Sequence, residues 1–321
     1  MVLLNQKKFM KNKYVINWEL SLACNLDCTF CSQKERRNIN SKIPDKVKIF
    51  KIIDNLPDNT HISFLWWETL LIPYILEVFD KLEESKISYE ITTNWILIEN
   101  YVKELSKLNF LSQINISIDW YGDFHDISRW KKWLFRKLMK CIPELIKSKK
   151  ISISTVISPN ITNENIVKLH LWLNNIWIIE HKLIYMMNFS KIDVDNSKKQ
   201  IKELKIWLPW SEKLDNEMLK KDFLEKVTIL KKLNTNTKLI IEPIALFKKW
   251  NIWCKQLVNQ LRIDENGKLS ICEFITNNFD DISKMKLEDA VKNNDFMEFK
   301  KLIKSKFPLD ICKTCCKLYE E

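Results

Sequence analysis

The sequence predicts an α/β fold in which helices cover a parallel sheet, followed by a small cysteine-rich segment. Strand-like and helix-like segments alternate from residue 14 to about 190, and most cysteines gather near residue 28 or in the last 70 residues. Alternating β and α units favour a parallel sheet with its helices outside. With 321 residues, the chain is long enough for one large α/β domain and a small appendage.

The expected strands are short runs rich in apolar residues, and the expected helices are amphipathic. In order, the strands span Tyr14–Leu20, His61–Leu65, Ile87–Thr92, Gln113–Ile118, Ile151–Ile157 and Trp177–Met186. The helices span Pro44–Asn55, Ile72–Ser85, Leu97–Leu108, Lys131–Lys147 and Asn163–Asn174.

The rest of the chain divides into two parts. Residues 191–242 are polar, with Ser211–Leu233 as the clearest helix, and we interpret them as a helical connector. Residues 243–321 hold five cysteines and form the cysteine-rich extension. The expected core domain is therefore residues 1–190.

The composition narrows the class of protein. The net charge of +11 comes mostly from lysines scattered along the chain, without a nucleic-acid-binding motif. The first 14 residues lack the apolar core of a secretory signal, and the most apolar stretch, 62–79, contains two glutamates and a proline. We therefore expect a soluble cytoplasmic protein, in which clustered cysteines are more often metal ligands than disulfides.

Three cysteines follow the first expected strand. Cys24, Cys28 and Cys31 have C-x₃-C-x₂-C spacing, which lets one loop present three thiolates to a [4Fe–4S] cluster. The fourth iron would then be open to another ligand. A zinc knuckle is the alternative, but it needs a fourth ligand and the next His or Cys is His61.

The run CNLDCTFC resembles the signature of radical S-adenosylmethionine (SAM) enzymes, in which SAM chelates the open iron. The resemblance covers nearly the whole chain. It implies a partial (β/α)6 TIM-like barrel, and each candidate site residue follows the C-terminal end of an expected strand, where such barrels place their chemistry. It also implies catalytic roles for Cys24, Cys28 and Cys31.

The resemblance further implies which residues contact SAM. They are Phe30, Trp66, Trp67, Glu68, Asn94, Ser117, Asp119 and Arg129. Glu68 would accept hydrogen bonds from the SAM ammonium group, and Arg129 would pair with its carboxylate or hold the loop through Asp126. Asp119 would bind ribose hydroxyls or brace its loop, and we expect His125 to be structural.

Tryptophan stands where this family has glycine. The chain has 13 Trp and 2 Gly, whereas ordinary usage would give roughly 22 Gly. Examples are Trp66-Trp67-Glu68 for Gly-Gly-Glu and Thr93-Asn94-Trp95 for Thr-Asn-Gly. The replaced positions are Trp66, Trp67, Trp95, Trp120, Trp130, Trp133 and Trp253. We hypothesise that these are UGA codons that the source organism reads as glycine; the alternative is a genuinely Trp-rich protein with a degenerate SAM site.

The C-terminal cysteines resemble the SPASM/twitch extension of radical SAM enzymes, which holds auxiliary iron–sulfur clusters. The resemblance rests on C-x₁₂-G-x₄-C spacing from Cys254 to Cys272 and on a strand–turn–strand reading of IDENGKLSIC. The implied ligands of one further [4Fe–4S] cluster are Cys254, Cys272, Cys312 and Cys315. Cys316 is an alternative ligand, a Cys₄ zinc site is the rival, and Cys141 is expected in the core.

These features predict a radical SAM enzyme, an oxidoreductase that cleaves SAM to a 5′-deoxyadenosyl radical for hydrogen abstraction. Its expected partners are a flavodoxin- or ferredoxin-like electron donor and a peptide or protein substrate. The alternatives are an iron–sulfur electron carrier or scaffold without SAM cleavage, and a zinc-binding interaction protein.

Overall fold

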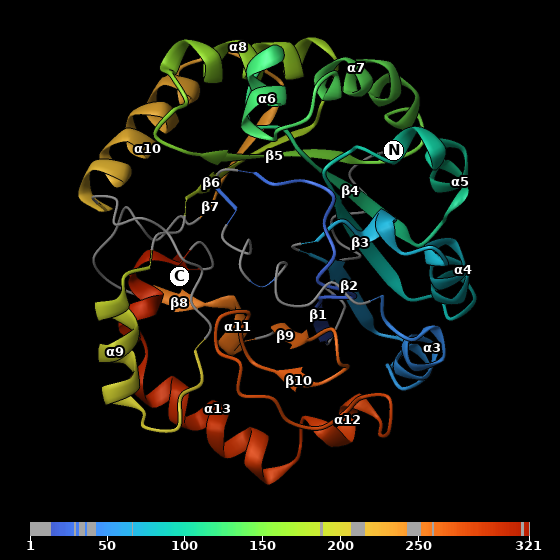
Figure 1. Cartoon of the computed structure of the whole chain (residues 1–321), viewed down its shortest axis with the longest axis vertical. Helices are drawn as coiled ribbons and strands as arrows, with labels where there is room; N and C mark the ends of the chain where they lie inside the picture. The colour runs from blue at the N-terminus through green and yellow to red at the C-terminus, as the bar shows by residue number, and fades with distance from the viewer. Residues whose placement is uncertain are drawn as a thin grey trace.

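The computed structural model describes residues 14–28, 30–31, 36, 43–65, 67–186, 189–206, 216–242, 252–258, 260–315 and 318–320. Its centre is a nine-stranded sheet with the order β10-β9-β1-β2-β3-β4-β5-β6-β7. All neighbouring strands are parallel except β9 and β10. The sheet curves around a central space, and its helices lie on the outer side (Figure 1). This is the expected partial barrel.

The six strands expected from the sequence are all present. They are β1 (Tyr14–Trp18), β2 (Thr60–Phe64), β3 (Ser88–Thr93), β4 (Leu111–Ser117), β5 (Ile151–Ile157) and β6 (Glu180–Tyr185). Their outward residues pack under the helices and are almost completely buried, as Ile62, Ile91 and Ile153 illustrate. Such burial on a sheet face supplies most of the stabilisation of the fold.

Helices α3 (Lys46–Asp54), α4 (Ile75–Glu84), α5 (Val102–Lys107), α7 (Leu134–Leu145) and α8 (Asn163–Asn175) cover the outer face. Asp45 caps α3 by accepting the Val47 amide, and Thr162 caps α8. Cys141 is buried in the core on α7, as predicted.

Three helices differ from the sequence prediction. The expected helix over Ile72–Ser85 begins only at Ile75, because a residue before proline disfavours helical geometry; a short 3₁₀ helix, η2 (Thr69–Leu71), precedes it. Another 3₁₀ turn, η3 (Ile98–Asn100), replaces the start of the expected helix over Leu97–Leu108. The helix expected over Lys131–Lys147 begins at Leu134, since Trp133 has a left-handed φ of 67°. An additional short helix, α6 (Asp123–Ser128), follows β4.

Residues 191–242 contain more than the expected helices. They form α9 (Lys191–Gln200) and α10 (Asn216–Lys231), but also β7 (Lys238–Glu242), which lies beside β6. Strand β7 was not predicted, because a five-residue segment with charged ends gives little periodic signal. The sheet therefore continues one parallel strand beyond the six predicted.

The cysteine-rich extension joins the same sheet. Strand β9 (Gln260–Ile263) pairs with β1 and turns back into β10 (Leu269–Ser270), which confirms the expected strand–turn–strand. The turn requires Gly267, whose φ is 74° and whose absent Cβ would lie 2.9 Å from the Ile52 side chain.

The remaining elements of the extension close the open side of the barrel (Figure 1). They are β8 (Ile252–Cys254), α11 (Lys255–Val258), α12 (Leu287–Ala290), α13 (Asn294–Lys306), η5 (Asp310–Thr314) and β11 (Leu318–Glu320). Among the described residues, no helix is long and apolar enough to cross a membrane.

Candidate functional site

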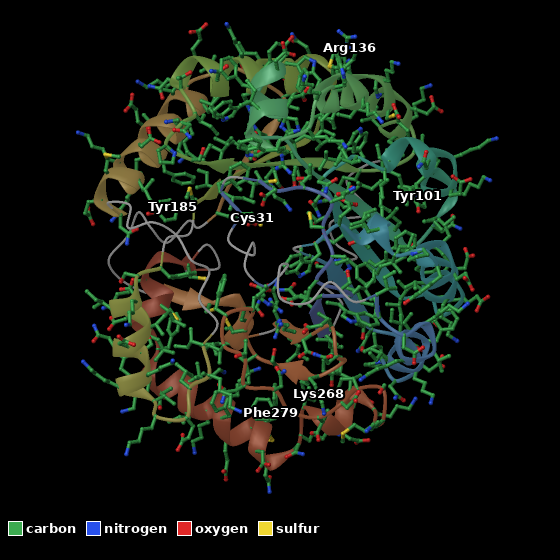
Figure 2. All side chains as sticks on the ribbon, viewed as in Figure 1. Cys31, Tyr101, Arg136, Tyr185, Lys268 and Phe279 are labelled. Atoms are coloured by element: carbon green, nitrogen blue, oxygen red, sulfur yellow. The ribbon has the colours of Figure 1, made fainter. Side chains whose placement is uncertain are left out.

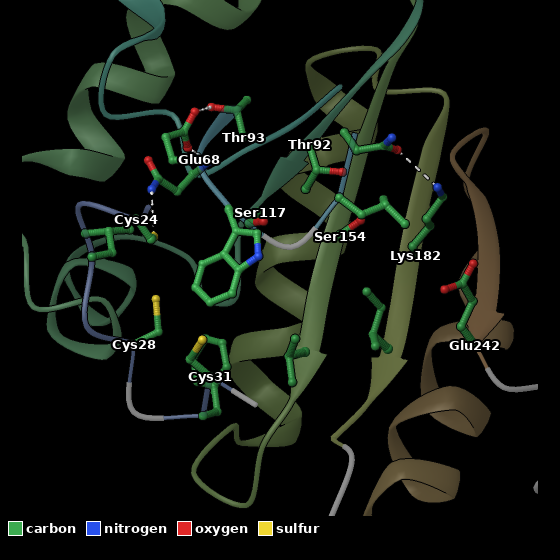
Figure 3. A pocket seen from close by; sticks show the side chains of 18 of the residues that line it. Cys24, Cys28, Cys31, Glu68, Thr92, Thr93, Ser117, Ser154, Lys182 and Glu242 are labelled. Atoms are coloured by element: carbon green, nitrogen blue, oxygen red, sulfur yellow. Dashed lines mark hydrogen bonds between the residues drawn. The ribbon is translucent and has the colours of Figure 1, made fainter. Parts of the chain in front are cut away.

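The three N-terminal cysteines lie on the rim of a cavity of about 380 Å³ inside the barrel, with the Cys31 side chain pointing to the centre (Figures 2 and 3). The Cys31 backbone amide donates to the Cys28 carbonyl, and the Asn94 side-chain amide donates to the Cys24 sulfur at 3.7 Å. Burial raises the pKa of Cys24, and it raises the pKa of Cys28 to about 12. Charge on Cys31 also raises the pKa of Cys24 and of Cys28, so a positively charged group is needed to hold them as thiolates.

The donor set of this loop fits an iron–sulfur cluster. Three soft thiolates are the ligands such a cluster prefers. In the described part of the chain, no three His, Cys, Asp or Glu side chains are arranged to hold a single metal ion.

Glu68 joins two loops at the edge of the cavity. One carboxylate oxygen accepts a hydrogen bond from the Thr93 hydroxyl at 2.8 Å, and the other accepts one from the Asn94 backbone amide at 2.6 Å. Burial raises the pKa of Glu68 to about 7, against the lowering effect of these hydrogen bonds. The sequence analysis singled out Glu68 and Asn94 but missed Thr93, which fixes the carboxylate.

Asn94, Ser117 and Phe30 also line the cavity, from three different loops. Asn94 follows β3, and its side chain donates to Asn25 in the cysteine loop at 2.8 Å. Ser117 ends β4, and Phe30 stands between the second and third cysteines. The fold therefore brings together residues that are far apart in the sequence.

Arg129 and Asp119 form a buried ion pair behind the cysteines. The Arg129 Nε donates to Asp119 at 2.8 Å, and the guanidinium lies 5.7 Å from the centre of the Phe30 ring. Arg129 lines the cavity, and its terminal nitrogens make no hydrogen bond with a described residue. Asp119 does not line the cavity. It braces the loop and also accepts the Val156 amide, whereas Asp126, the other loop partner considered for Arg129, accepts the Phe135 amide.

His125 has a structural position, as expected. It is completely buried, and its Nδ1 accepts the Asp119 amide at 3.3 Å. Burial and the nearby Arg129 charge hold the pKa of His125 well below its ordinary value. The neutral ring supports the Asp119 loop.

Trp67 lines the cavity beside Glu68, whereas Trp66 lies outside the described residues. Trp67 is 5% exposed, and its indole N–H has no hydrogen-bond partner in the described chain. The indole groups of Trp95 and Trp120 are likewise buried without a partner. Buried indole N–H groups ordinarily find an acceptor, but the indole N–H of Trp172 in α8 is also buried without a described partner, so this feature alone does not separate glycine positions from tryptophan positions.

Backbone geometry distinguishes four of the tryptophans from the others. Trp95, Trp130, Trp133 and Trp177 have φ between 55° and 76°, and the only other described non-glycine residue with positive φ is Lys86. Both glycines, Gly122 and Gly267, have φ of 73° to 74°. Left-handed geometry is rare for a bulky side chain and easy for glycine. The geometry supports the hypothesis that these positions are glycine positions, including Trp177, which no motif had singled out.

The C-terminal cysteines form a second group, within the extension. Burial, and after it the charge on Cys254, raises the pKa of Cys272 to about 12. The pKa of Cys312 is raised by burial and then by Cys272 and Cys254, which shows that the three thiols are neighbours. The Cys315 backbone amide donates to the Cys312 carbonyl at 3.1 Å, so Cys315 lies one turn of η5 away from Cys312. Cys316 and the side chain of Trp253 lie outside the described residues.

Strand β1 connects the two cysteine groups. Glu19, directly after β1, receives two hydrogen bonds from Arg262 on β9, at 3.0 and 2.9 Å. Arg36 binds the same carboxylate at 2.7 Å. Asn17 on β1 donates to Glu273, the residue after Cys272, at 2.7 Å.

The deeper part of the cavity is polar, which the sequence analysis did not predict. Its lining includes Asn17, Ser63, Glu90, Thr92, Asn115, Ser154, Lys182 and Glu242. The signal was present as strict alternation of polar and apolar residues, as in Gln113-Ile-Asn115-Ile-Ser117. In a strand whose outer face is buried under helices, the alternating polar side chains must point into the barrel.

Two family profiles match the chain. The radical SAM superfamily profile matches residues 18–173, and the profile of SPASM, an iron–sulfur cluster-binding domain, matches residues 254–316. No protein of curated function is significantly similar to the chain in sequence. The second match favours an iron–sulfur cluster over zinc at the C-terminal cysteines.

Solved structures show the same fold at low identity. SuiB from Streptococcus suis bound to S-adenosylmethionine has a TM-score of 0.71 and 17% identity, over 98% of this chain and 75% of that chain. SuiB bound to its precursor peptide SuiA has a TM-score of 0.68 and 17% identity, over 98% and 74%. The protein anSMEcpe with AdoMet and the Cp18Cys peptide has a TM-score of 0.59 and 18% identity, over 95% and 88%.

Proposed function

We propose, on the premise that this chain is a radical SAM enzyme with a C-terminal SPASM domain, that it cleaves SAM reductively and abstracts a hydrogen atom from a peptide or protein substrate. One observation carries the proposal: Cys24, Cys28, Glu68, Asn94 and Arg129 line the same cavity at the C-terminal edge of the sheet. Barrels of this type place their chemistry at that edge.

The cofactors are a [4Fe–4S] cluster with SAM and a further iron–sulfur cluster in the extension. When bound, the reduced cluster and SAM supply a 5′-deoxyadenosyl radical. Cys24, Cys28 and Cys31 would hold the first cluster, and Cys254, Cys272, Cys312 and Cys315 the second.

The chain's own residues orient SAM in this proposal. Glu68 would accept the SAM ammonium through the oxygen bound to the Asn94 backbone amide, which retains a lone pair, whereas the other oxygen already accepts the Thr93 hydroxyl and the Leu70 amide. The terminal nitrogens of Arg129 take the SAM carboxylate, while its Nε remains bound to Asp119. Asp119 is thus a positioning residue. Of the two roles that the sequence left open, this contact supports bracing the loop rather than binding ribose hydroxyls.

A peptide or protein substrate is supported by the likeness to SuiB and anSMEcpe, which were solved with peptides bound. Below the residues proposed to bind SAM, the described lining encloses a polar space that is open to part of a substrate. A flavodoxin- or ferredoxin-like protein would supply the electron, in the reducing cytoplasm where thiols stay reduced.

Trp67 favours the second candidate, an iron–sulfur scaffold without SAM cleavage, if position 67 is truly tryptophan. Its indole lines the cavity next to Glu68 and fills space that the SAM methionine would need. With glycine at positions 66 and 67, that obstacle is removed.

Anaerobic reconstitution with iron, sulfide, SAM and dithionite tests the proposal. The chain with glycine at positions 66 and 67 should form 5′-deoxyadenosine and methionine, and Cys28→Ala should form neither. Cys141→Ala is the matched control, because Cys141 lies in the core and away from the cavity. Absence of 5′-deoxyadenosine from the reconstituted, brown protein would contradict SAM cleavage and favour the scaffold.

A further inference from the structure

The deep part of the cavity contains a carboxylate for which the SAM site has no use. Glu242 is the last residue of β7, and it pairs in register with Ile184 of β6. Its half-buried side chain lines the cavity together with Lys182. Figure 3 shows Lys182 and Glu242 on the wall opposite the three cysteines.

The other charged residues of the cavity wall already have partners. Arg129 is bound to Asp119, and Glu68 is held by Thr93 and Asn94.

Glu90 and Lys182 lie near each other in the deep part of the cavity. Glu90 accepts the Ser63 hydroxyl at 2.6 Å, and Lys182 donates to Asn115 at 3.0 Å. Burial alone would raise the pKa of Glu90, but the Lys182 ammonium and the Ser63 hydrogen bond hold it below its ordinary value. The charges of Glu90 and Lys182 therefore offset each other.

Glu242 differs from these residues. It makes no hydrogen bond or ion pair with any residue that the structure describes. A partly buried carboxylate without a partner destabilises a fold, so such a group is retained where a ligand supplies the missing donor. Lys182 offsets Glu90, Arg129 offsets Asp119, and Glu68 is assigned to the SAM ammonium, so Glu242 is the carboxylate of the described cavity wall that is left without a cation.

We propose that Glu242 binds a cationic group of the substrate, an ammonium or a guanidinium, and thereby selects which residue enters the barrel. The inference rests on the proposed function, since it concerns the substrate of the same cavity. A cation is favoured over a neutral donor because it offsets the charge of Glu242, and charge-assisted hydrogen bonds are about twice as strong as neutral ones. SAM itself is held by residues after β1 to β4, on the opposite wall.

The test measures discrimination between two probe peptides by the reconstituted protein in the presence of SAM. The probes are acetyl-Ala-Lys-Ala-amide and the same peptide with norleucine, which has a similar length and no charge. Their dissociation constants are measured by saturation-transfer NMR. We expect the lysine peptide to bind about tenfold more tightly than the norleucine peptide. Glu242→Gln should abolish this preference, and Glu242→Lys should reverse it.

The matched control is Glu84→Gln, which removes an exposed carboxylate at the end of α4 and should keep the full preference. Equal binding of both peptides to the parent protein, or an unchanged preference in Glu242→Gln, would overturn the inference. SAM cleavage without peptide is measured separately on the parent protein, which in these tests carries glycine at positions 66 and 67. A parent that selects lysine but forms no 5′-deoxyadenosine would contradict the proposed function and leave the Glu242 site standing.

Discussion

The positive-φ tryptophans give a prediction that distinguishes glycine positions from tryptophan positions. Trp130, Trp133 and Trp177 have φ of 55°, 67° and 63°, and their side chains are 74%, 59% and 77% exposed. At each position we compare the glycine variant with the alanine variant. Both variants remove the indole and its contacts, so the difference between them reports on the backbone.

The magnitude follows from the backbone geometry. A Cβ in left-handed geometry costs about 1–2 kcal/mol, which exceeds the entropic advantage of alanine over glycine. We expect each glycine variant to be more stable than its alanine counterpart by about 1 kcal/mol. With an unfolding entropy of roughly 2 cal/mol/K per residue, the triple glycine variant should melt about 4 °C above the triple alanine variant.

At the control position, the alanine variant should be more stable than the glycine variant. Trp172 lies in α8, where glycine is less favourable than alanine by about 1 kcal/mol. Thermal melts followed by circular dichroism measure both comparisons on reconstituted protein without relying on tryptophan fluorescence. Alanine variants at 130, 133 and 177 that melt at or above the glycine variants would refute the argument. Peptide mass spectrometry of the protein from its source organism should then show tryptophan rather than glycine.

Three further predictions concern titration, stability and metal content. The pKa of Glu68 is raised to about 7, so the folded chain holds a proton there that the unfolded chain loses near pH 4.5. Stability should therefore fall as pH rises from about 4.5 to about 7. Glu68→Gln should flatten the dependence of melting temperature on pH. Glu19→Gln breaks a buried ion pair and should reduce stability by about 3–5 kcal/mol, whereas Glu144→Gln, in an exposed pair, should change it by under about 0.5 kcal/mol in the same melts. Iron analysis should give about eight atoms per chain and about four in either Cys272→Ser or Cys28→Ser; about four in the parent protein would contradict a second [4Fe–4S] cluster.

Local pattern was sufficient to predict much of the fold and the rim of the site. The apolar strands and the amphipathic helices follow from periodicity, and Cys24, Cys28 and Cys31 follow from spacing. Glu68 and Asn94 were identified through the family resemblance, on motifs that follow β2 and β3, and the carboxyl ends of parallel strands meet at one edge of the sheet.

Local sequence pattern did not predict the long-range polar contacts. The bond from Thr93 to Glu68 spans 25 residues, and the pairing of Glu19 with Arg262 spans 243. No periodicity encodes which buried charge meets which partner, because that choice depends on tertiary packing. The role of Asp119 illustrates the point: the sequence allowed a ribose contact or a brace, and its distance of 2.8 Å from Arg129 supports the brace.

The contacts of β1 also bear on how the extension relates to the barrel. Strand β9 adds to the barrel sheet beside β1, and Asn17 and Glu19 bind Glu273 and Arg262 through buried hydrogen bonds. The chain then runs directly from Glu19 to Cys24. A separately folding appendage would not leave its polar partners buried in the sheet of its neighbour, since each would be unsatisfied alone. We infer that the extension and the barrel fold as one unit, so that loss of the Glu19 contact disturbs both cysteine groups together.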